Sequence, residues 1–137
     1  MKVYFILLSF LYLMRMFISI RSILGGLLGW SLFSFPNYLY ILNHLADMVV
    51  FSLCLAGCLD LAFKKRLLNF SPDKWRRTYQ ATLMVGILNV LLYCYGDRFG
   101  APALIRNPGI FTVIKFFLPY VLFAIPVIVH EHELKKE

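Results

Sequence analysis

A chain of 137 residues that is 61% hydrophobic and only 15% charged has the composition of a membrane protein, because soluble domains carry about 25% charged residues. A folded soluble chain of this size would still expose about 30% of its unfolded surface to water. The formal net charge of +7 does not indicate nucleic-acid binding, since the basic residues gather at the ends of apolar runs and form no basic helix.

The first apolar run, 3–20, is close to the ~20 residues that a membrane-spanning helix needs, and it contains Arg15. It follows a charged start like that of a signal peptide, but no small-x-small cleavage site follows, so we expect a retained helix. The next run, 22–35, is too short for a comfortable span and contains glycines and Trp30. It predicts a re-entrant or interfacial segment after the first helix. One long tilted helix over 3–35 is the alternative.

The second span is predicted over 38–63, after the turn signal Pro36-Asn37. It is the most polar of the spans, since it contains Asn43, His44, Asp47 and Asp60. We expect Asp60 to pair with Lys64, one helical turn later. Polar groups within a membrane are costly, so these side chains are expected to face the interior of the bundle and to have partners there.

A basic loop, 64–77, follows the second span. Within it Ser71-Pro72 is typical of a helix start, so the third helix is predicted to begin at Pro72 and to cross the membrane over 75–95, with Gly96 as its stop. The basic residues of this loop are predicted to set the topology and to bind anionic lipid headgroups. They are Lys64, Lys65, Arg66, Lys74, Arg76 and Arg77.

The fourth span is predicted over 109–129, kinked by Pro119 and Pro126, with a polar tail, 130–137, that frays into water. The four spans make one domain, 1–137, an all-α membrane protein with a four-helix transmembrane bundle. Nine basic residues then lie on the side of the basic loop and both termini, against three arginines on the other side. The positive-inside rule predicts that both termini are cytoplasmic, in a membrane such as the bacterial inner membrane.

Polar residues from four spans fall at nearly one depth, roughly 18 to 24 Å from the basic-loop end of each span at 1.5 Å per residue. These residues are Arg15, Asp47, Asn89 and Lys115. One interpretation is structural, with a buried pair between Arg15 and Asp47 that fixes the register of the helices. The other is a functional site in which two cations face one carboxylate, so that an acidic partner or an anionic ligand supplies the missing charge. Lys115 snorkelling to the outer interface would weaken that second interpretation.

Helical spacing places several of these residues on small and polar stripes, as is usual where helices pack in lipid. The stripes are Tyr12, Arg15, Ser19 and Ser22; Asn43, Asp47, Cys54 and Cys58; and Thr82, Gly86, Asn89 and Tyr93. The sequence contains no phosphate loop, nucleophile elbow or matched histidine pair for haem, and His130 and His132 point to opposite sides of a helix. We therefore expect no enzyme activity, no cofactor and no metal site.

Three functions fit these features. The first is a non-catalytic accessory or structural subunit of a larger membrane protein complex, because the chain has almost no mass outside the bilayer for independent chemistry. The second is an oligomeric transporter or channel-like protein for an anion or protons that uses the intramembrane polar cluster. The third is a membrane-embedded immunity or effector protein. The expected partners are the lipid bilayer with its anionic headgroups and either another membrane protein or further copies of this chain.

Overall fold

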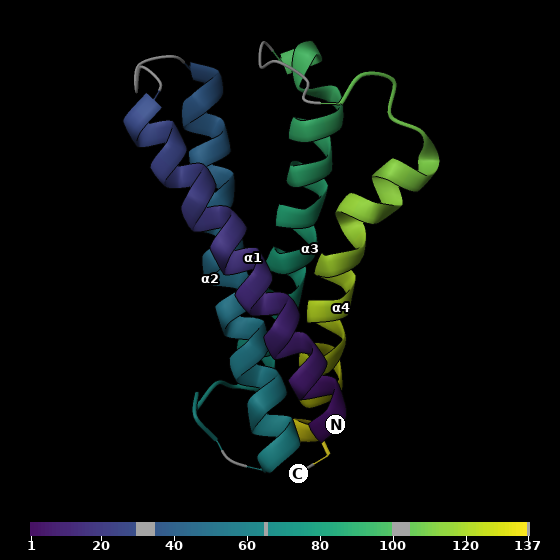
Figure 1. Cartoon of the computed structure of the whole chain (residues 1–137). Coiled ribbons are helices and arrows are strands. Elements are labelled where there is room, and N and C mark those ends of the chain that lie inside the picture. Colours follow the sequence, from purple (N-terminus) through teal and green to yellow (C-terminus); the bar gives the residue numbers. More distant parts are fainter. Residues whose placement is uncertain (30–34, 65, 100–104, 137) are drawn as a thin grey trace.

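The computed structural model describes residues 1–29, 35–64, 66–99 and 105–136. These residues form four long helices and one short 3-10 helix, and no strand occurs among them (Figure 1). The elements are α1 (Lys2–Gly29), α2 (Phe35–Phe63), α3 (Pro72–Tyr95), η1 (Gly96–Phe99) and α4 (Ile110–Leu134). All four long helices contain a stretch that is long and apolar enough to cross a membrane. The predicted four-helix transmembrane bundle is confirmed.

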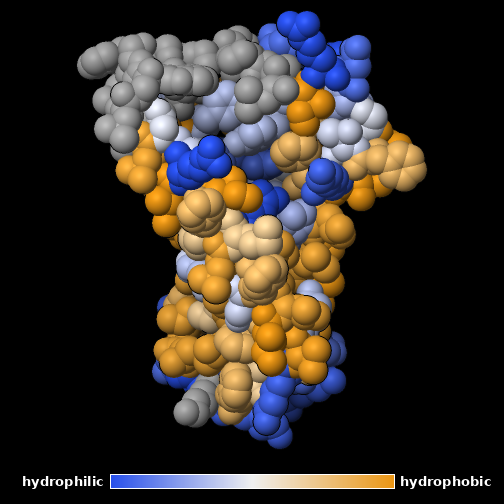
Figure 2. All heavy atoms as spheres, viewed as in Figure 1, coloured by the Kyte–Doolittle hydropathy of each residue, from blue (hydrophilic) through white to orange (hydrophobic). Residues whose placement is uncertain are grey.

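The helices are arranged as two pairs that meet at one end and diverge at the other (Figure 1). Helix α1 packs on α2, α3 packs on α4, and α2 also contacts both α3 and α4. Both termini lie at the narrow end, beside the loop from α2 to α3. We call the opposite end the open end. Figure 2 shows a broad band of hydrophobic side chains between the two ends, as a bilayer requires.

Aromatic side chains from three helices form the core where the two pairs meet. Phe51 of α2 packs between Tyr120 and Phe123 of α4, with ring centroids 5.0 and 4.4 Å apart. Trp75 of α3 is completely buried. Two glycines make room for these rings: a Cβ atom on Gly57 would lie 2.9 Å from the Trp75 ring, and one on Gly86 would lie 2.7 Å from Tyr120 Cγ.

Helix α1 differs from the prediction. It continues without a break from Lys2 to Gly29, so the first part of the predicted re-entrant or interfacial segment is instead the end of a long helix. Gly25 has open space around it, and a helix surrounded by lipid tolerates glycine because no water competes for its backbone hydrogen bonds. The rest of that predicted segment, residues 30–34, lies outside the described residues. Helix α2 begins at Phe35, earlier than predicted.

Helix α3 begins at Pro72 and ends at Tyr95, as predicted, although the side chain of Ser71 makes no capping hydrogen bond. Gly96 has right-handed backbone angles (φ −56°, ψ −32°), so the chain continues into η1 instead of reversing.

Helix α4 runs to Leu134, so the prediction that the tail after residue 129 frays into water is wrong. The tail stays helical because His130 and Glu131 are buried against the bundle. Figure 1 shows α4 bending in its first half. Pro119 explains the bend, since its ring nitrogen has no hydrogen to donate to the carbonyl of residue 115.

Candidate functional site

Asp47 and Asp60 of α2 are the two most deeply buried carboxylates among the described residues, and Asp47 is the one nearer the middle of its span. Its side chain is 1% exposed, and its Oδ1 atom accepts a hydrogen bond of 2.6 Å from the Tyr120 hydroxyl. The Arg15 guanidinium lies over the rings of Tyr120 and Phe51, at 5.8 and 5.9 Å from their centroids. The predicted direct pair of Arg15 with Asp47 is therefore wrong within the described part of the chain. Tyr120 contacts both of them, the cation with its ring and the carboxylate with its hydroxyl.

A second set of polar contacts joins α1, α2 and α3 nearer the open end. The ring nitrogens of His44 lie 3.3 Å from the Ser19 hydroxyl and 2.8 Å from the Tyr93 hydroxyl. Tyr40 packs edge-on against Tyr93 with centroids 5.1 Å apart, and its hydroxyl donates to the Leu92 carbonyl. His44 thus has a partner on each ring nitrogen, as a buried imidazole requires.

We call these side chains together the polar network: Arg15, Ser19, His44, Asp47, Tyr93 and Tyr120. All four helices contribute to it, and every member contacts another member. Figure 2 shows hydrophilic residues in the hollow between the two helix pairs at the open end. Polar contacts between helices fix how the helices pack, and this is the chemistry expected of a structural element.

Asn89 and Lys115, the other two residues predicted at this depth, do not join the polar network. Asn89 is 2% exposed and its Oδ1 atom has no hydrogen-bond partner in the described structure. Lys115 is exposed and contacts none of the described polar groups. Tyr120 lies five positions after Lys115, which is about 140° around a helix at 3.6 residues per turn. The two side chains therefore face different directions.

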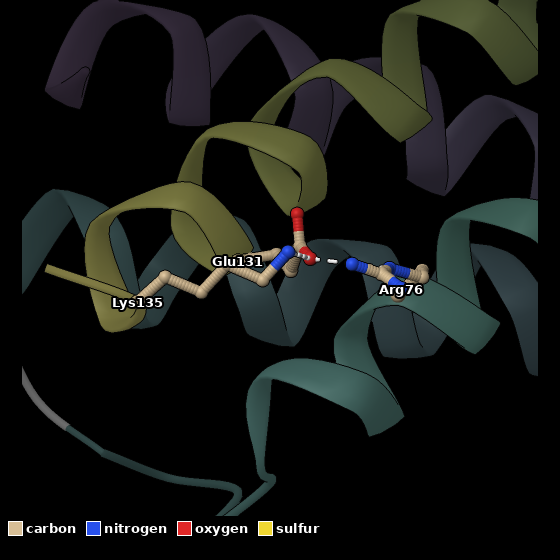
Figure 3. Close-up of polar contacts among 3 residues, drawn as sticks. All are labelled: Arg76, Glu131 and Lys135. Carbon is tan, nitrogen blue, oxygen red and sulfur yellow. Dashed lines mark ion pairs between the residues drawn. The ribbon is translucent and has the colours of Figure 1, made fainter.

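The basic residues of the loop 64–77 lie at the narrow end, and Lys65 falls outside the described residues. Arg76 Nε lies 3.4 Å from Glu131 Oε1, and Lys135 pairs with the same carboxylate (Figure 3). Arg76 therefore connects α3 to the end of α4, a role the sequence did not indicate. Lys74 lies over the Phe70 ring at 5.5 Å. Lys64, Arg66 and Arg77 are also exposed.

Asp60 does not pair with Lys64, and that prediction is wrong. Its Oδ1 atom instead accepts a hydrogen bond of 2.8 Å from the Leu67 backbone N–H. The chain can turn back toward Asp60 because Lys64 adopts a left-handed conformation, with φ of 52°, just after α2. Asp60 thereby holds the loop against the end of α2.

The sequence predicted the polar faces of the helices better than it predicted the contacts between the helices. Ser19 and Tyr93 belong to the predicted polar stripes, and both lie in the polar network. Tyr120 was not singled out, although it is the residue that joins Arg15 to Asp47. Its position directly after Pro119, on the helix opposite the Gly86 stripe, is the only sequence signal that could have drawn attention to it.

One prediction tests whether the bond between Tyr120 and Asp47 stabilises the bundle. Tyr120→Phe leaves a buried carboxylate oxygen without its donor, so the free energy of unfolding is expected to fall by about 1–3 kcal/mol. Tyr12→Phe is the matched control, because that hydroxyl contacts only Ser52 at an exposed position. Thermal unfolding in detergent should show a lower midpoint for Tyr120→Phe than for Tyr12→Phe. Equal midpoints would contradict the assignment.

The class of protein follows from these observations: an integral membrane protein whose four spans are joined by an internal polar network. Comparison with known proteins identifies no relative of this chain. No protein-family model matches the chain, and neither a curated protein nor a solved structure matches it.

Proposed function

We propose that this protein is a non-catalytic subunit that binds a transmembrane helix of another membrane protein in a groove between α2 and α3. The groove has a volume of about 380 Å³ and lies in the halves of these helices near the open end. It is lined by Leu39, Leu42, Asn43, Ala46, Val85, Leu88, Leu91 and Leu92. Leu42 and Leu88 are 43% and 55% exposed, so the groove opens to the lipid-facing surface.

The Asn43 amide is the observation that carries this proposal. Asn43 lines the groove and is 8% exposed, and its Nδ2 atom has no hydrogen-bond partner in the described structure. An unpaired amide in hydrocarbon is unfavourable, because neither water nor an acyl chain can accept its hydrogens. A transmembrane helix with a polar side chain supplies an acceptor, and Ala46 leaves space for that helix to approach closely.

The shape of the groove favours another protein over a second copy of this chain. Two identical grooves facing each other across a two-fold axis would both remain hollow, because neither projects into the other. A single helix is convex and fills the depression. The occupant is therefore a helix with small residues and one hydrogen-bond acceptor at the level of Asn43.

The proposed orientation places the narrow end in the cytoplasm. Nine of the basic residues belong to that side, and three arginines belong to the other. This excess is the signature that sets topology in membranes such as the bacterial inner membrane. The groove then lies in the outer half of the bilayer.

Filling the groove tests the proposal. Ala46→Phe places a large ring inside it, whereas Val49→Phe adds the same ring at a 60% exposed position of α2 outside the groove. Tagged protein purified from its native membrane in mild detergent is expected to retain a stoichiometric membrane partner in the wild type and in Val49→Phe. Ala46→Phe should lower retention about tenfold, which corresponds to 1.4 kcal/mol. Equal retention in all three proteins would overturn the proposal.

Arg15 favours a second candidate function, the transport of an anion or protons. Its guanidinium contacts two aromatic rings but forms no ion pair with a described carboxylate. A cation of this kind within a membrane span is a place where an anion can bind. Purified protein in liposomes would then conduct ions, and Arg15→Ala would abolish the flux. A flux that depends on Arg15 without any partner would replace the subunit proposal.

A further inference from the structure

A second cavity lies at the narrow end, between the end of α2, the start of the basic loop and the end of α4. It has a volume of about 400 Å³ and, unlike the groove, is lined largely by charged and polar side chains. These include Asp60, Lys64, Arg66, His130 and Glu133. We call it the interfacial cleft, because the ends of the spanning helices lie at the level of lipid headgroups.

The floor of the interfacial cleft carries an incompletely satisfied carboxylate. Asp60 is 1% exposed, and Leu67 N–H already donates to its Oδ1 atom. Its Oδ2 atom has no hydrogen-bond partner in the described structure. His130 Nε2 lies 4.0 Å from this atom, which is too far for a hydrogen bond. A buried carboxylate oxygen of this kind requires an N–H or O–H donor.

The rim of the same cleft has the opposite charge. Lys64 is exposed, and Arg66 is exposed beside it in the lining. Ammonium and guanidinium groups at this level bind phosphate, and a guanidinium does so with paired N–H donors. Glu133 adds a second carboxylate on the α4 side. The cleft therefore matches a ligand with a phosphate at one end and a hydrogen-bonding cation at the other.

We propose that the interfacial cleft binds a phosphoethanolamine group. The phosphate contacts Lys64 and Arg66, and the primary ammonium donates hydrogen bonds to Asp60 Oδ2 and to Glu133. A purely anionic headgroup would leave Asp60 Oδ2 without a donor and place negative charge near two carboxylates. A choline group carries the same charge as ethanolamine but has no N–H to donate.

A metal ion fits the interfacial cleft less well than this ligand. Among the described residues, no group of three or more His, Cys, Asp or Glu side chains is arranged to hold one. The source of the phosphoethanolamine is a phospholipid of the surrounding membrane, since the cleft opens where headgroups lie. A soluble phosphoethanolamine shares the same chemistry, and a competition experiment separates the two sources.

Lipid binding to the full-length protein in detergent tests this site. Native mass spectrometry with matched-chain phosphatidylethanolamine, phosphatidylglycerol and phosphatidylcholine should show preferential retention of phosphatidylethanolamine. Asp60→Asn keeps an oxygen for Leu67 N–H but replaces the second oxygen with an amide. It is expected to lower the preference for phosphatidylethanolamine over phosphatidylcholine about tenfold. Asp73→Asn, an exposed carboxylate at the start of α3 and outside the cleft lining, is the matched control and should leave the preference unchanged.

The phosphate contacts are tested separately by the double variant of Lys64→Ala with Arg66→Ala, which changes only exposed side chains and preserves the core. It should weaken phosphatidylethanolamine binding, whereas Lys74→Ala, outside the cleft lining, should not. Displacement of the lipid by millimolar soluble phosphoethanolamine would identify a soluble ligand as the source. Equal retention of the three lipids, or a preference that Asp60→Asn does not change, would overturn the site. The experiment needs no protein partner, so its result is independent of the proposed subunit role.

Discussion

Gly86→Ala is expected to destabilise the folded protein by about 1–3 kcal/mol, because it adds a methyl group where α3 and α4 have no space for one. The new Cβ atom would lie 2.7 Å from Tyr120 Cγ and 2.9 Å from Tyr120 Cβ. Neither atom is the flexible end of a side chain, so α4 itself must move away. Movement of Tyr120 would also lengthen its hydrogen bond to Asp47 and so weaken the polar network.

Gly25→Ala is the matched control for this prediction. No atom lies within 4 Å of a Cβ built on Gly25, and the residue is exposed on α1. Replacing glycine by alanine in an open helix position is neutral or stabilises by about 0.5–1 kcal/mol. The midpoint of thermal unfolding in detergent should therefore fall for Gly86→Ala and stay or rise for Gly25→Ala. Similar midpoints would show that α3 and α4 do not pack as closely as described.

Asn43→Leu is expected to separate stability from function. The substitution replaces an amide without a partner by an apolar side chain of similar size, so the isolated protein should become more stable by about 1 kcal/mol. The same change removes the donor that recognises the partner helix. Retention of the partner should then fall about tenfold or more, while the purified subunit unfolds at a higher temperature.

Asn89→Leu provides the comparison for Asn43→Leu. Asn89 is likewise buried and has one unpaired amide atom, its Oδ1, but it does not line the groove. Its substitution should change stability and leave partner retention unchanged. If both variants lose the partner to the same degree, general repacking of the bundle explains the loss and the groove does not.

The membrane spans were predictable because the thickness of the bilayer sets the length of apolar sequence that a spanning helix needs. Pro72 and Tyr95 bound α3 in the structure as the turn residues predicted. The polar stripes also predicted which faces turn inward, since Asn43, Asp47 and Asn89 are all buried. These features depend on local sequence, so one amino-acid sequence is enough to predict them.

The contacts between helices were less predictable because depth along a helix does not determine direction around it. Arg15 and Asp47 were predicted at similar depth, yet each of them contacts Tyr120 and they form no ion pair with each other among the described residues. Lys115 was predicted at that depth too, but its side chain points in a different direction from that of Tyr120. The end of α4 was mispredicted because Glu131 pairs with Arg76, a residue far away in the sequence. Such pairings require the packing of three helices to be known first.

Site-specific photo-crosslinking from the groove in the native membrane is the most direct test of the proposed subunit role. A photoreactive residue at Leu88 lies in the groove lining. The same residue at Ile87, which is 46% exposed and outside that lining, points about 100° away around α3. We predict one discrete adduct with a different membrane protein from position 88, none from position 87, and loss of the adduct when Asn43→Leu is added. Adducts of equal yield from both positions, an adduct with a second copy of this chain, or an adduct that survives Asn43→Leu would contradict the proposal.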